Sequence, residues 1–196
     1  MNNNLTYKMQ LPLVEFDTAI ESQKELLSIT KKEFRMIPNM YKAMANTPIL
    51  LKTYMDAYKG FRTQSNFSAT EQEIIFLTIS VENNCSYCMA AHSLIADLVS
   101  KVPPNITDAI RNGEEIPDTK LKSLYEFTSI MVNKRGNPSN EDVKSFLESG
   151  YNEKHILDII LAISIKTISN YTNHIFHTEV DPTFKIREWK SFKAVR

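Results

Sequence analysis

The sequence has few glycines, only two cysteines, no excess of either charge and no long apolar run, and these shortages exclude several protein classes. Only 4 glycines occur in 196 residues, which argues against a β-rich or Rossmann-type chain because turns and phosphate loops use glycine. The 23 basic and 23 acidic residues balance, so no global field attracts a nucleic acid. The most apolar run, residues 156–168, contains Asp158 and Lys166 and is shorter than the roughly 20 apolar residues of a bilayer span.

The two ends of the chain add to these exclusions. The first ten residues are polar and lack the charged and then apolar regions of a secretory signal. We therefore expect a cytoplasmic protein without membrane or nucleic-acid partners. The stretch 181–196 reads as a solvated basic tail with dispersed cations, namely Lys185, Arg187, Lys190, Lys193 and Arg196.

The remaining composition is that of one soluble all-α domain. Hydrophobic residues make up 42% of the chain and charged residues 23%, which is ordinary for a globular protein. Helical spacing of apolar residues, with capping residues and prolines at the ends, predicts a series of helices and no strands. The expected helices cover approximately residues 17–34, 38–45, 47–63, 70–82, 85–100, 104–111, 119–134, 140–149 and 152–179. We expect an N-terminal extension over about 1–66, a core over 67–180 and the tail over 181–196.

The sequence between Cys85 and His92 carries the pattern with the most chemical content. At 100° per residue on a helix, Cys85, Cys88 and His92 share one narrow face. If Asn84 caps this helix, Cys85 lies in its first turn, where free N–H groups and the helix dipole stabilise a thiolate. His92 is placed to accept or relay a proton. This arrangement predicts a redox-active cysteine pair.

Glu73 is expected to face His92 from the preceding helix. The chain breaks at residues 83–84, and in an antiparallel hairpin Glu73 and His92 come to similar heights on either side of that break. A buried carboxylate there can orient the imidazole. The alternative is that Glu73 is only a capping-box carboxylate for Thr70, since both Ser68 with Glu71 and Thr70 with Glu73 fit that pattern.

These residues resemble a known family. Glu73, Cys85, Cys88 and His92 stand at the spacings of the alkylhydroperoxidase D-like / carboxymuconolactone decarboxylase-like superfamily, in its cysteine-containing, peroxidase-related branch. The stretch 37–45 is also similar to the segment that precedes the core in longer members. The resemblance implies an all-α, compact multi-helix bundle built around a helical hairpin that carries the CxxC motif.

The same resemblance implies an activity, partners and residue roles. Cys88 would attack a hydroperoxide and become a sulfenic acid, Cys85 would resolve it as a disulfide, and Glu73 and His92 would relay protons. A dithiol donor, such as a lipoyl group or a thioredoxin-like protein, would restore the thiols. Members are usually homo-oligomers, often trimers or hexamers. This chain departs from alkylhydroperoxidase D at Tyr87, which replaces a histidine and is a candidate hydrogen-bond donor to a sulfur or an oxyanion, or a packing residue.

Several other interpretations of these residues stay open. The cysteines are alternatively inert core thiols, or zinc ligands together with His92 and Glu73, although we expect neither a metal nor a cofactor. The superfamily's other activity is a lactone decarboxylase, and a non-catalytic redox sensor would use the same disulfide to switch assembly. His174 and His177, three residues apart on the last helix, are expected at a subunit contact rather than at a metal.

Overall fold

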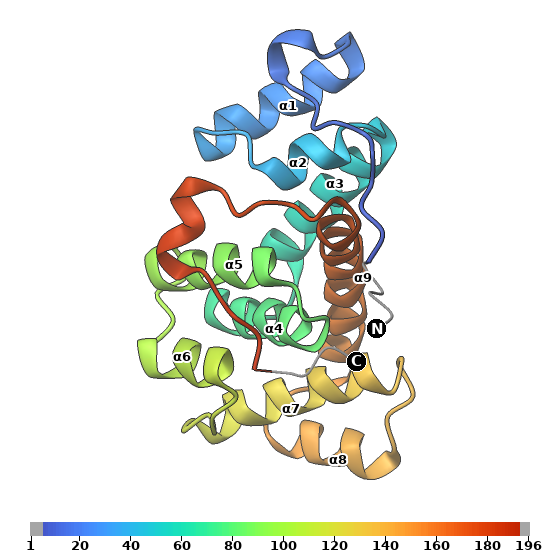
Figure 1. Ribbon diagram of the computed structural model, residues 1–196. Helices are drawn as coiled ribbons and strands as arrows, with labels where there is room; N and C mark the ends of the chain where they lie inside the picture. Colours follow the sequence, from blue (N-terminus) through green and yellow to red (C-terminus); the bar gives the residue numbers. More distant parts are fainter. Residues whose placement is uncertain (1–5, 193–196) are drawn as a thin grey trace.

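The computed structural model describes residues 6–192, and over these residues the chain consists of helices and loops with no strand (Figure 1). This confirms the predicted all-α class. The nine α-helices of the described chain are α1 (Glu21–Phe34), α2 (Asn39–Met44), α3 (Pro48–Gln64), α4 (Ala69–Glu82), α5 (Ser86–Leu98), α6 (Pro104–Asn112), α7 (Thr119–Asn133), α8 (Asn140–Glu148) and α9 (Glu153–Phe176). Two short 3-10 helices flank them, η1 (Phe16–Thr18) and η2 (Pro182–Arg187).

Local capping signals set most helix ends where the sequence predicts them. Ser68 begins α4 with a capping box, in which its hydroxyl accepts from the backbone N–H of Glu71 at 3.3 Å and the Glu71 carboxylate accepts from the backbone N–H of Ser68. Asp118 and Asn152 cap α7 and α9 with their side chains. Gly113 ends α6 in the left-handed conformation at φ 71°.

The core is organised around α4. Every residue of α4 from Glu71 to Val81 is buried, which is the pattern of a helix packed on all sides. Its neighbours are α5, α6, α7 and α9. Asn84, in the left-handed conformation at φ 55°, turns the chain sharply between α4 and α5, so these two helices form the predicted hairpin at the centre of the molecule (Figure 1).

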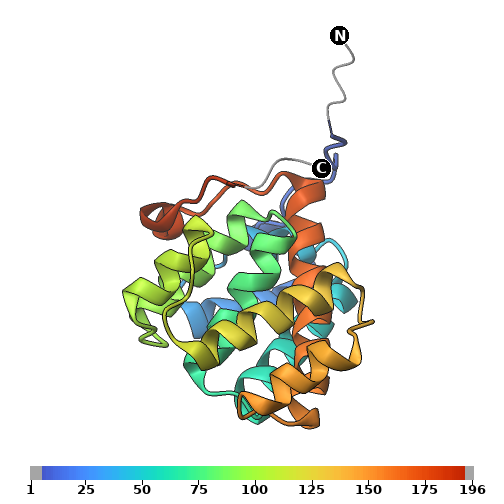
Figure 2. The same cartoon turned by 90° about the horizontal axis from the view of Figure 1, so that it is seen from below.

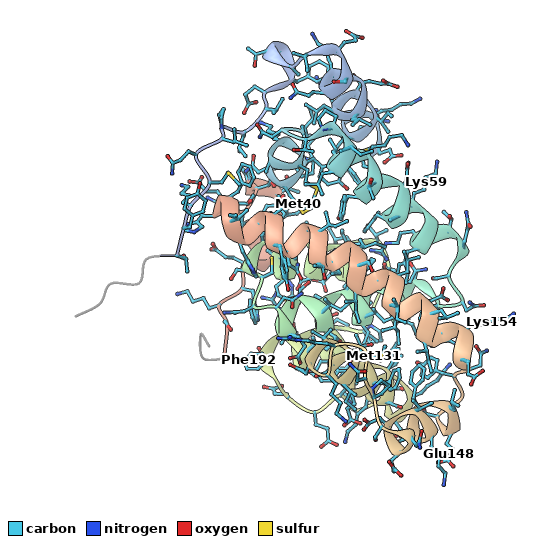
Figure 3. The ribbon with its side chains drawn as sticks, turned by 90° about the vertical axis from the view of Figure 1, so that its right-hand side faces the viewer. Met40, Lys59, Met131, Glu148, Lys154 and Phe192 are labelled. Carbon is cyan, nitrogen blue, oxygen red and sulfur yellow. The ribbon has the colours of Figure 1, made fainter. Side chains whose placement is uncertain are left out.

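The long helix α9 lies across one side of the bundle (Figure 3) and packs on α2, α3, α4 and α5. Its inner face buries apolar residues together with Lys166, Ser169, Asn170 and Asn173. Its outer face is exposed, and that face includes Leu157 at 67% exposure. Over residues 6–192, no helix combines the length and apolarity needed to span a bilayer.

The C-terminal segment corrects the expectation of a solvated tail. Figures 1 and 2 both show it crossing α5, where η2 packs. Arg187 pairs with Asp97 at 3.1 Å and with Asp108 at 2.7 Å, and Trp189 is 5% exposed. The segment that carries these cations therefore packs on the helices, because the burial of Trp189 and the ion pairs of Arg187 hold it there. Two residues of the predicted tail, Lys193 and Arg196, lie outside the described residues.

Candidate active site

The two cysteines lie at the turn between α4 and α5, but not at the predicted positions of the helix. Asn84 is not the cap. Cys85 is the N-cap, with an extended backbone at φ −98° and ψ 95°, and α5 begins at Ser86. Cys88 is consequently the thiol in the first turn, where the helix N–H groups favour a thiolate. Both cysteines are buried and reduced in this structure.

The pKa values of the two thiols are displaced in opposite directions. Burial raises the pKa of the Cys85 thiol, and its hydrogen bond with Cys88 and the charge of Cys88 raise it further. Burial also opposes ionisation of Cys88, but the hydrogen bond from Cys85, the Lys166 charge and His92 outweigh it and hold the pKa of Cys88 well below its ordinary value. Of the two thiols, Cys88 is therefore the one that ionises more readily, and Cys85 keeps its proton to higher pH.

Helix α9 supplies further contacts to the Cys88 sulfur. The Asn173 side-chain amide donates to Cys88 Sγ at 3.3 Å and lies 3.9 Å from Cys85 Sγ. Ser169 Oγ lies 3.8 Å from Cys88 Sγ. The Asn173 amide is the donor of the two, since the Ser169 hydroxyl donates to the Lys166 carbonyl oxygen at 3.2 Å, and a buried thiolate needs such a donor because it has lost the hydrogen bonds of water. Residues on α9 thus complete the surroundings of the reactive sulfur.

Glu73 and His92 meet across the α4–α5 hairpin as predicted. His92 Nδ1 lies 2.9 Å from Glu73 Oε2, and Glu73 is fully buried. The other carboxylate oxygen accepts from the Arg62 guanidinium and from the Ser100 hydroxyl at 3.3 Å. Glu73 is therefore not a cap for Thr70: its oxygens are occupied by groups from α3, from α5 and from the loop after α5.

The charges around this carboxylate fix the state of the imidazole. Burial raises the pKa of Glu73, but His92 and Arg62 outweigh it, so the pKa lies below its ordinary value and the carboxylate is ionised. Burial and the nearby Lys166 charge lower the pKa of His92 despite the opposing effect of Glu73, so His92 is neutral at pH 7. Because an ionised carboxylate only accepts hydrogen bonds, Nδ1 carries the proton and Nε2 is free to accept one.

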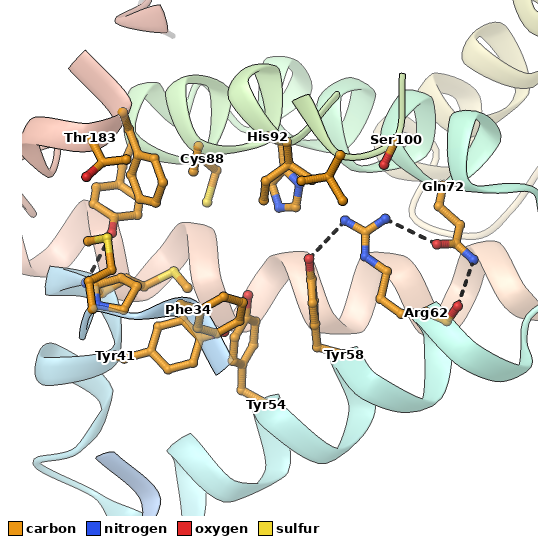
Figure 4. A pocket seen from close by; sticks show the side chains of 18 of the residues that line it. Phe34, Tyr41, Tyr54, Tyr58, Arg62, Gln72, Cys88, His92, Ser100 and Thr183 are labelled. Atoms are coloured by element: carbon orange, nitrogen blue, oxygen red, sulfur yellow. Dashed lines mark hydrogen bonds between the residues drawn. The ribbon is translucent and has the colours of Figure 1, made fainter. Parts of the chain in front are cut away.

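A cavity of about 550 Å³ opens onto Cys88 and His92. In Figure 4 both side chains project from α5 towards Tyr54, Tyr58 and Arg62 on α3. The walls are mostly apolar and aromatic, and they come from α1, α2 and the connection between them, from α3, α4 and α5, and from η2. Besides the residues already named, the lining includes Phe34, Met36, Met40, Tyr41, Ile95, Val99 and Phe184. A reacting molecule in this cavity meets a sulfur and an imidazole within an apolar enclosure.

One wall of the cavity is a chain of aromatic contacts. Phe34 contacts Tyr41, Tyr41 contacts Tyr54 and Tyr54 stacks on Tyr58, each with ring centroids 5.6 to 5.9 Å apart. The Tyr58 hydroxyl accepts from Arg62 at 2.9 Å. Burial raises the pKa of Tyr58, so this phenol stays neutral. The wall therefore presents ring faces and hydroxyl groups rather than charge.

Tyr87 does not point at the sulfurs with its hydroxyl. That hydroxyl donates to the Asp181 carboxylate at 2.5 Å, and Asp181 also accepts from the backbone N–H of Asn39 at 3.2 Å. The Tyr87 ring contacts Phe184 edge to face. Tyr87 thus ties the C-terminal segment and α2 to α5 along one edge of the cavity.

The structure brings Glu73, Cys85, Cys88 and His92 together and adds residues that the motif did not indicate. These are Tyr58, Arg62, Ser100, Lys166, Ser169, Asn173 and Asp181. One signal was available: Lys166, Ser169, Asn170 and Asn173 form a polar stripe at helical spacing within an otherwise apolar helix. Within residues 6–192, no three His, Cys, Asp or Glu side chains are grouped so that they could hold a metal ion. His174 and His177 are exposed and lie on the outer part of α9's C-terminal end.

Similarity to solved structures places this arrangement in a known fold. An alkylhydroperoxidase AhpD core, an uncharacterized peroxidase-related protein from Ralstonia eutropha JMP134, superimposes with a TM-score of 0.79 over 92% of this chain and 97% of that chain, at 18% identity. An uncharacterized peroxidase-related protein from Silicibacter sp. TM1040 gives 0.77 over 91% and 93%, at 20% identity. The chain has the alkylhydroperoxidase D-like fold.

A protein of different chemistry shares the same fold. A point variant of the debrominase Bmp8, in complex with 2,3,4-tribromopyrrole, gives a TM-score of 0.75 over 92% of this chain and 96% of that chain, at 14% identity. No protein-family model matches the sequence, and no curated protein is significantly similar to it. At these identities the comparisons establish the fold, and the activity has to be argued from the residues at the cavity.

Proposed function

We propose that this chain, with its alkylhydroperoxidase D-like fold, is a thiol-dependent peroxidase that reduces organic hydroperoxides through Cys88 and Cys85. The observation that carries the proposal is the state of Cys88 at the cavity wall. Its pKa is held well below the ordinary value, a neutral imidazole lies on the same helix, and a second thiol hydrogen-bonds to it. A thiolate, a proton carrier and a resolving thiol are the groups that peroxide reduction needs.

The first step uses the cavity. The Cys88 thiolate attacks the terminal oxygen of the hydroperoxide, the O–O bond breaks, and Cys88 becomes a sulfenic acid. The alkoxide that leaves takes up a proton from solvent water, which the free Nε2 of neutral His92 can relay, and departs as an alcohol. Glu73 lies behind the cavity wall and holds the imidazole through the 2.9 Å contact to Nδ1, so that the other nitrogen faces the reacting atoms. Arg62 lines the cavity and pairs with the other oxygen of Glu73.

The second step uses the turn before α5. The Cys85 thiol attacks the sulfur of the sulfenic acid, a disulfide forms, and the hydroxyl leaves as water with the proton of the thiol. Because Cys85 is the N-cap and lies outside the helix proper, its sulfur can move without unwinding α5. An external dithiol, of the lipoyl or thioredoxin kind, then reduces the disulfide and returns the protein to its starting state. The sulfurs of the dithiol donor are oxidised to a disulfide in this step.

The walls of the cavity favour a bulky apolar hydroperoxide over hydrogen peroxide. Aromatic rings from α1, α2 and α3 form one wall, and burying the organic group of the substrate against them contributes binding energy that hydrogen peroxide cannot use. We therefore expect cumene hydroperoxide to react faster than hydrogen peroxide. The electron donor is expected to reach the disulfide once the alcohol has left.

The test follows the two sulfurs separately. Pre-reduced wild-type protein treated with one equivalent of cumene hydroperoxide should lose both free thiols and form a Cys85–Cys88 disulfide, seen by mass spectrometry. Cys85→Ser should stop at a Cys88 sulfenic acid that dimedone traps, and Cys88→Ser should not react. Retention of both thiols by folded wild-type protein would refute the proposal.

Turnover separates this proposal from two other functions. A redox sensor of the same design would form the disulfide once and change its assembly state without steady consumption of peroxide. A lactone decarboxylase would act on a carboxylactone even as the Cys85→Ser, Cys88→Ser double variant. Steady-state peroxide consumption with dihydrolipoamide, lost in that double variant, is the result we expect.

A second candidate is the reductive removal of bromine or iodine from an aromatic ring. The observation that favours it is the aromatic wall of the cavity beside Cys88, together with the shared fold of a debrominase that binds 2,3,4-tribromopyrrole. The balanced reaction converts a halogenated ring and two thiols into the ring with hydrogen in place of halogen, a disulfide and the hydrogen halide. Bromide release from 2,3,4-tribromopyrrole by the reduced protein, at a rate above that of its peroxide reaction, would favour this candidate.

A further inference from the structure

Lys166 is a buried cation that the steps above do not use. It lies on α9, its exposed fraction is 0%, and its Nζ has no hydrogen-bond partner among the described residues. The nearest aromatic ring is that of Phe76, whose centroid lies 5.6 Å from Nζ. An ammonium group without water, hydrogen bonds or a counter-ion is strongly unfavourable in a protein interior. Some anionic group must therefore balance it.

The register of α9 places Lys166 on the face that contacts Cys88. Ser169 and Asn173, three and seven residues further along, lie on the same side of the helix and are the residues 3.8 and 3.3 Å from Cys88 Sγ. Lys166 acts electrostatically on Cys85, on Cys88 and on His92. The ammonium thus belongs to the immediate surroundings of the two sulfurs.

The other charges near the sulfurs are already balanced. From α3, Arg62 pairs with Glu73 of α4, and these two charges cancel. His92 of α5 is neutral, and the tyrosines of α3 are un-ionised because burial raises their pKa values. Within the described residues of this cluster, the Cys88 sulfur is the group left to carry a negative charge opposite Lys166.

We propose that Lys166 is the counter-cation of the Cys88 thiolate and a positioning residue for the reaction at that sulfur. The pair is neutral as a whole, so the thiolate can persist in a buried site that would otherwise protonate it. The inference rests on the proposed role of Cys88 as the nucleophile. It adds the group that keeps this nucleophile charged.

The experiment measures thiolate rather than activity. Lys166→Met keeps the length of the side chain and removes its charge, and Lys154→Met makes the same change at an exposed position of the same helix. Thiolate absorbance at 240 nm is titrated in a Cys85→Ser background, so that only Cys88 contributes. We expect Lys166→Met to move the inflection of the Cys88 titration curve upward by at least one pH unit. At a pH below that inflection, this corresponds to about a tenfold loss of the thiolate form. Lys154→Met should leave the inflection in place, and an unmoved inflection in folded Lys166→Met overturns the proposal.

A second measurement guards against a variant that merely packs badly. Melting temperatures are compared for Lys166→Met alone and for Lys166→Met combined with Cys88→Ser. In the Cys88→Ser background the ammonium has no counter-ion, so Lys166→Met should raise the melting temperature of that variant. When Cys88 is present, Lys166→Met should raise the melting temperature by a smaller amount or lower it. Equal effects in both backgrounds would mean that Lys166 only packs against Phe76. The titration and the melting temperatures do not depend on peroxide turnover. They can therefore contradict the role of Lys166 without contradicting the proposed function, and the reverse.

Discussion

The side-chain amide of Asn173, near the end of α9, donates a hydrogen bond to the sulfur of Cys88 over 3.3 Å. The two residues lie 85 positions apart in the chain, and the contact joins the long surface helix to the first turn of α5. Hydrogen bonds to a charged group contribute about 1.5 to 3 kcal/mol. Asn173 therefore stabilises the thiolate form of Cys88, in addition to the N-terminal end of α5.

Replacing Asn173 with Leu should raise the pKa of Cys88 by about one to two units, because the donor is lost while the shape of the side chain is nearly kept. The rate of sulfenic acid formation at pH 7 should fall by about tenfold or more. Stopped-flow reaction with cumene hydroperoxide across pH 5 to 9 measures both effects. Ser164→Ala, on the exposed face of α9, is the control, and an identical pH profile for Asn173→Leu would contradict the assignment.

The part of the site that the sequence predicts correctly depends on local geometry. Ser68 marks the start of α4, and counting residues from the break at 83–84 brings Glu73 opposite His92, because two helices of one hairpin rise equally from their turn. The N-cap of α5 lies one residue later than predicted, at Cys85 rather than at Asn84. Both Asn83 and Asn84 suit a helix boundary, and the left-handed backbone of Asn84 shifts the cap to Cys85.

The contributions of α3 and α9 could not be predicted in the same way. Arginine and lysine are residue types that usually lie on the surface. Only the packing of α3 and α9 on α4 and α5 places Arg62 beside Glu73 and Lys166 near the sulfur of Cys88. The solvated tail was predicted from charge alone. Trp189 and the ion pairs of Arg187 anchor the segment, while Lys185 and Lys190 stay exposed to solvent, so a charge pattern alone does not show whether a segment docks.

Glu73→Gln is expected to reduce both stability and activity. The carboxylate is fully buried between Arg62 and His92, and removing one member of a buried ion pair costs about 3 to 5 kcal/mol. The folded-state pKa of Glu73 is lowered, so its contribution is present above the unfolded pKa of about 4.3 and is lost as pH falls through the folded value.

Thermal unfolding of wild type and Glu73→Gln at pH 7, 5 and 3.5 tests this. The difference in melting temperature should be largest at pH 7 and 5 and should narrow at pH 3.5, because there the carboxylate of the unfolded chain is already largely protonated and the lowered pKa of the folded state contributes less. Glu115→Gln, at an exposed carboxylate that pairs with Lys122 on the surface, should change little at any pH. A difference that is constant across the three values would show that the charge of Glu73 is not what stabilises the fold.

Tyr87→Phe should loosen the C-terminal segment without removing the thiolate. The hydroxyl is engaged with Asp181, and losing one buried hydrogen bond to a carboxylate costs about 1.5 to 3 kcal/mol. The melting temperature should therefore fall, and limited proteolysis within residues 181–192 should become faster. The rate of the peroxide reaction of Cys88 should stay within about threefold of wild type. A loss of that reaction with an unchanged melting temperature would instead assign Tyr87 to the chemistry.

The homo-oligomer implied by the sequence resemblance stays a prediction, and the outer face of α9 is where we expect a second copy to bind. Exposed apolar side chains form two pairs on this face, Leu157 with Leu161 and Tyr171 with Ile175. Between the pairs, the exposed Ser164 and the half-buried Ile168 continue the steps of three and four residues. Such steps form the seam by which two like helices pair, and the seam lies on the open side of the molecule shown in Figure 3.

Leu157→Lys and Leu161→Lys together should therefore lower the mass of the particle in solution, because two charges at the centre of an apolar contact are not compensated there. Mass photometry or light scattering coupled to gel filtration measures this. Ile49→Lys, at a side chain that is 69% exposed on α3, is the matched control and should leave the mass unchanged. Because the seam faces away from the cavity, the Cys88 titration should be the same in the assembled and separated forms; a wild-type protein that is already monomeric at micromolar concentration would refute the assignment of this face.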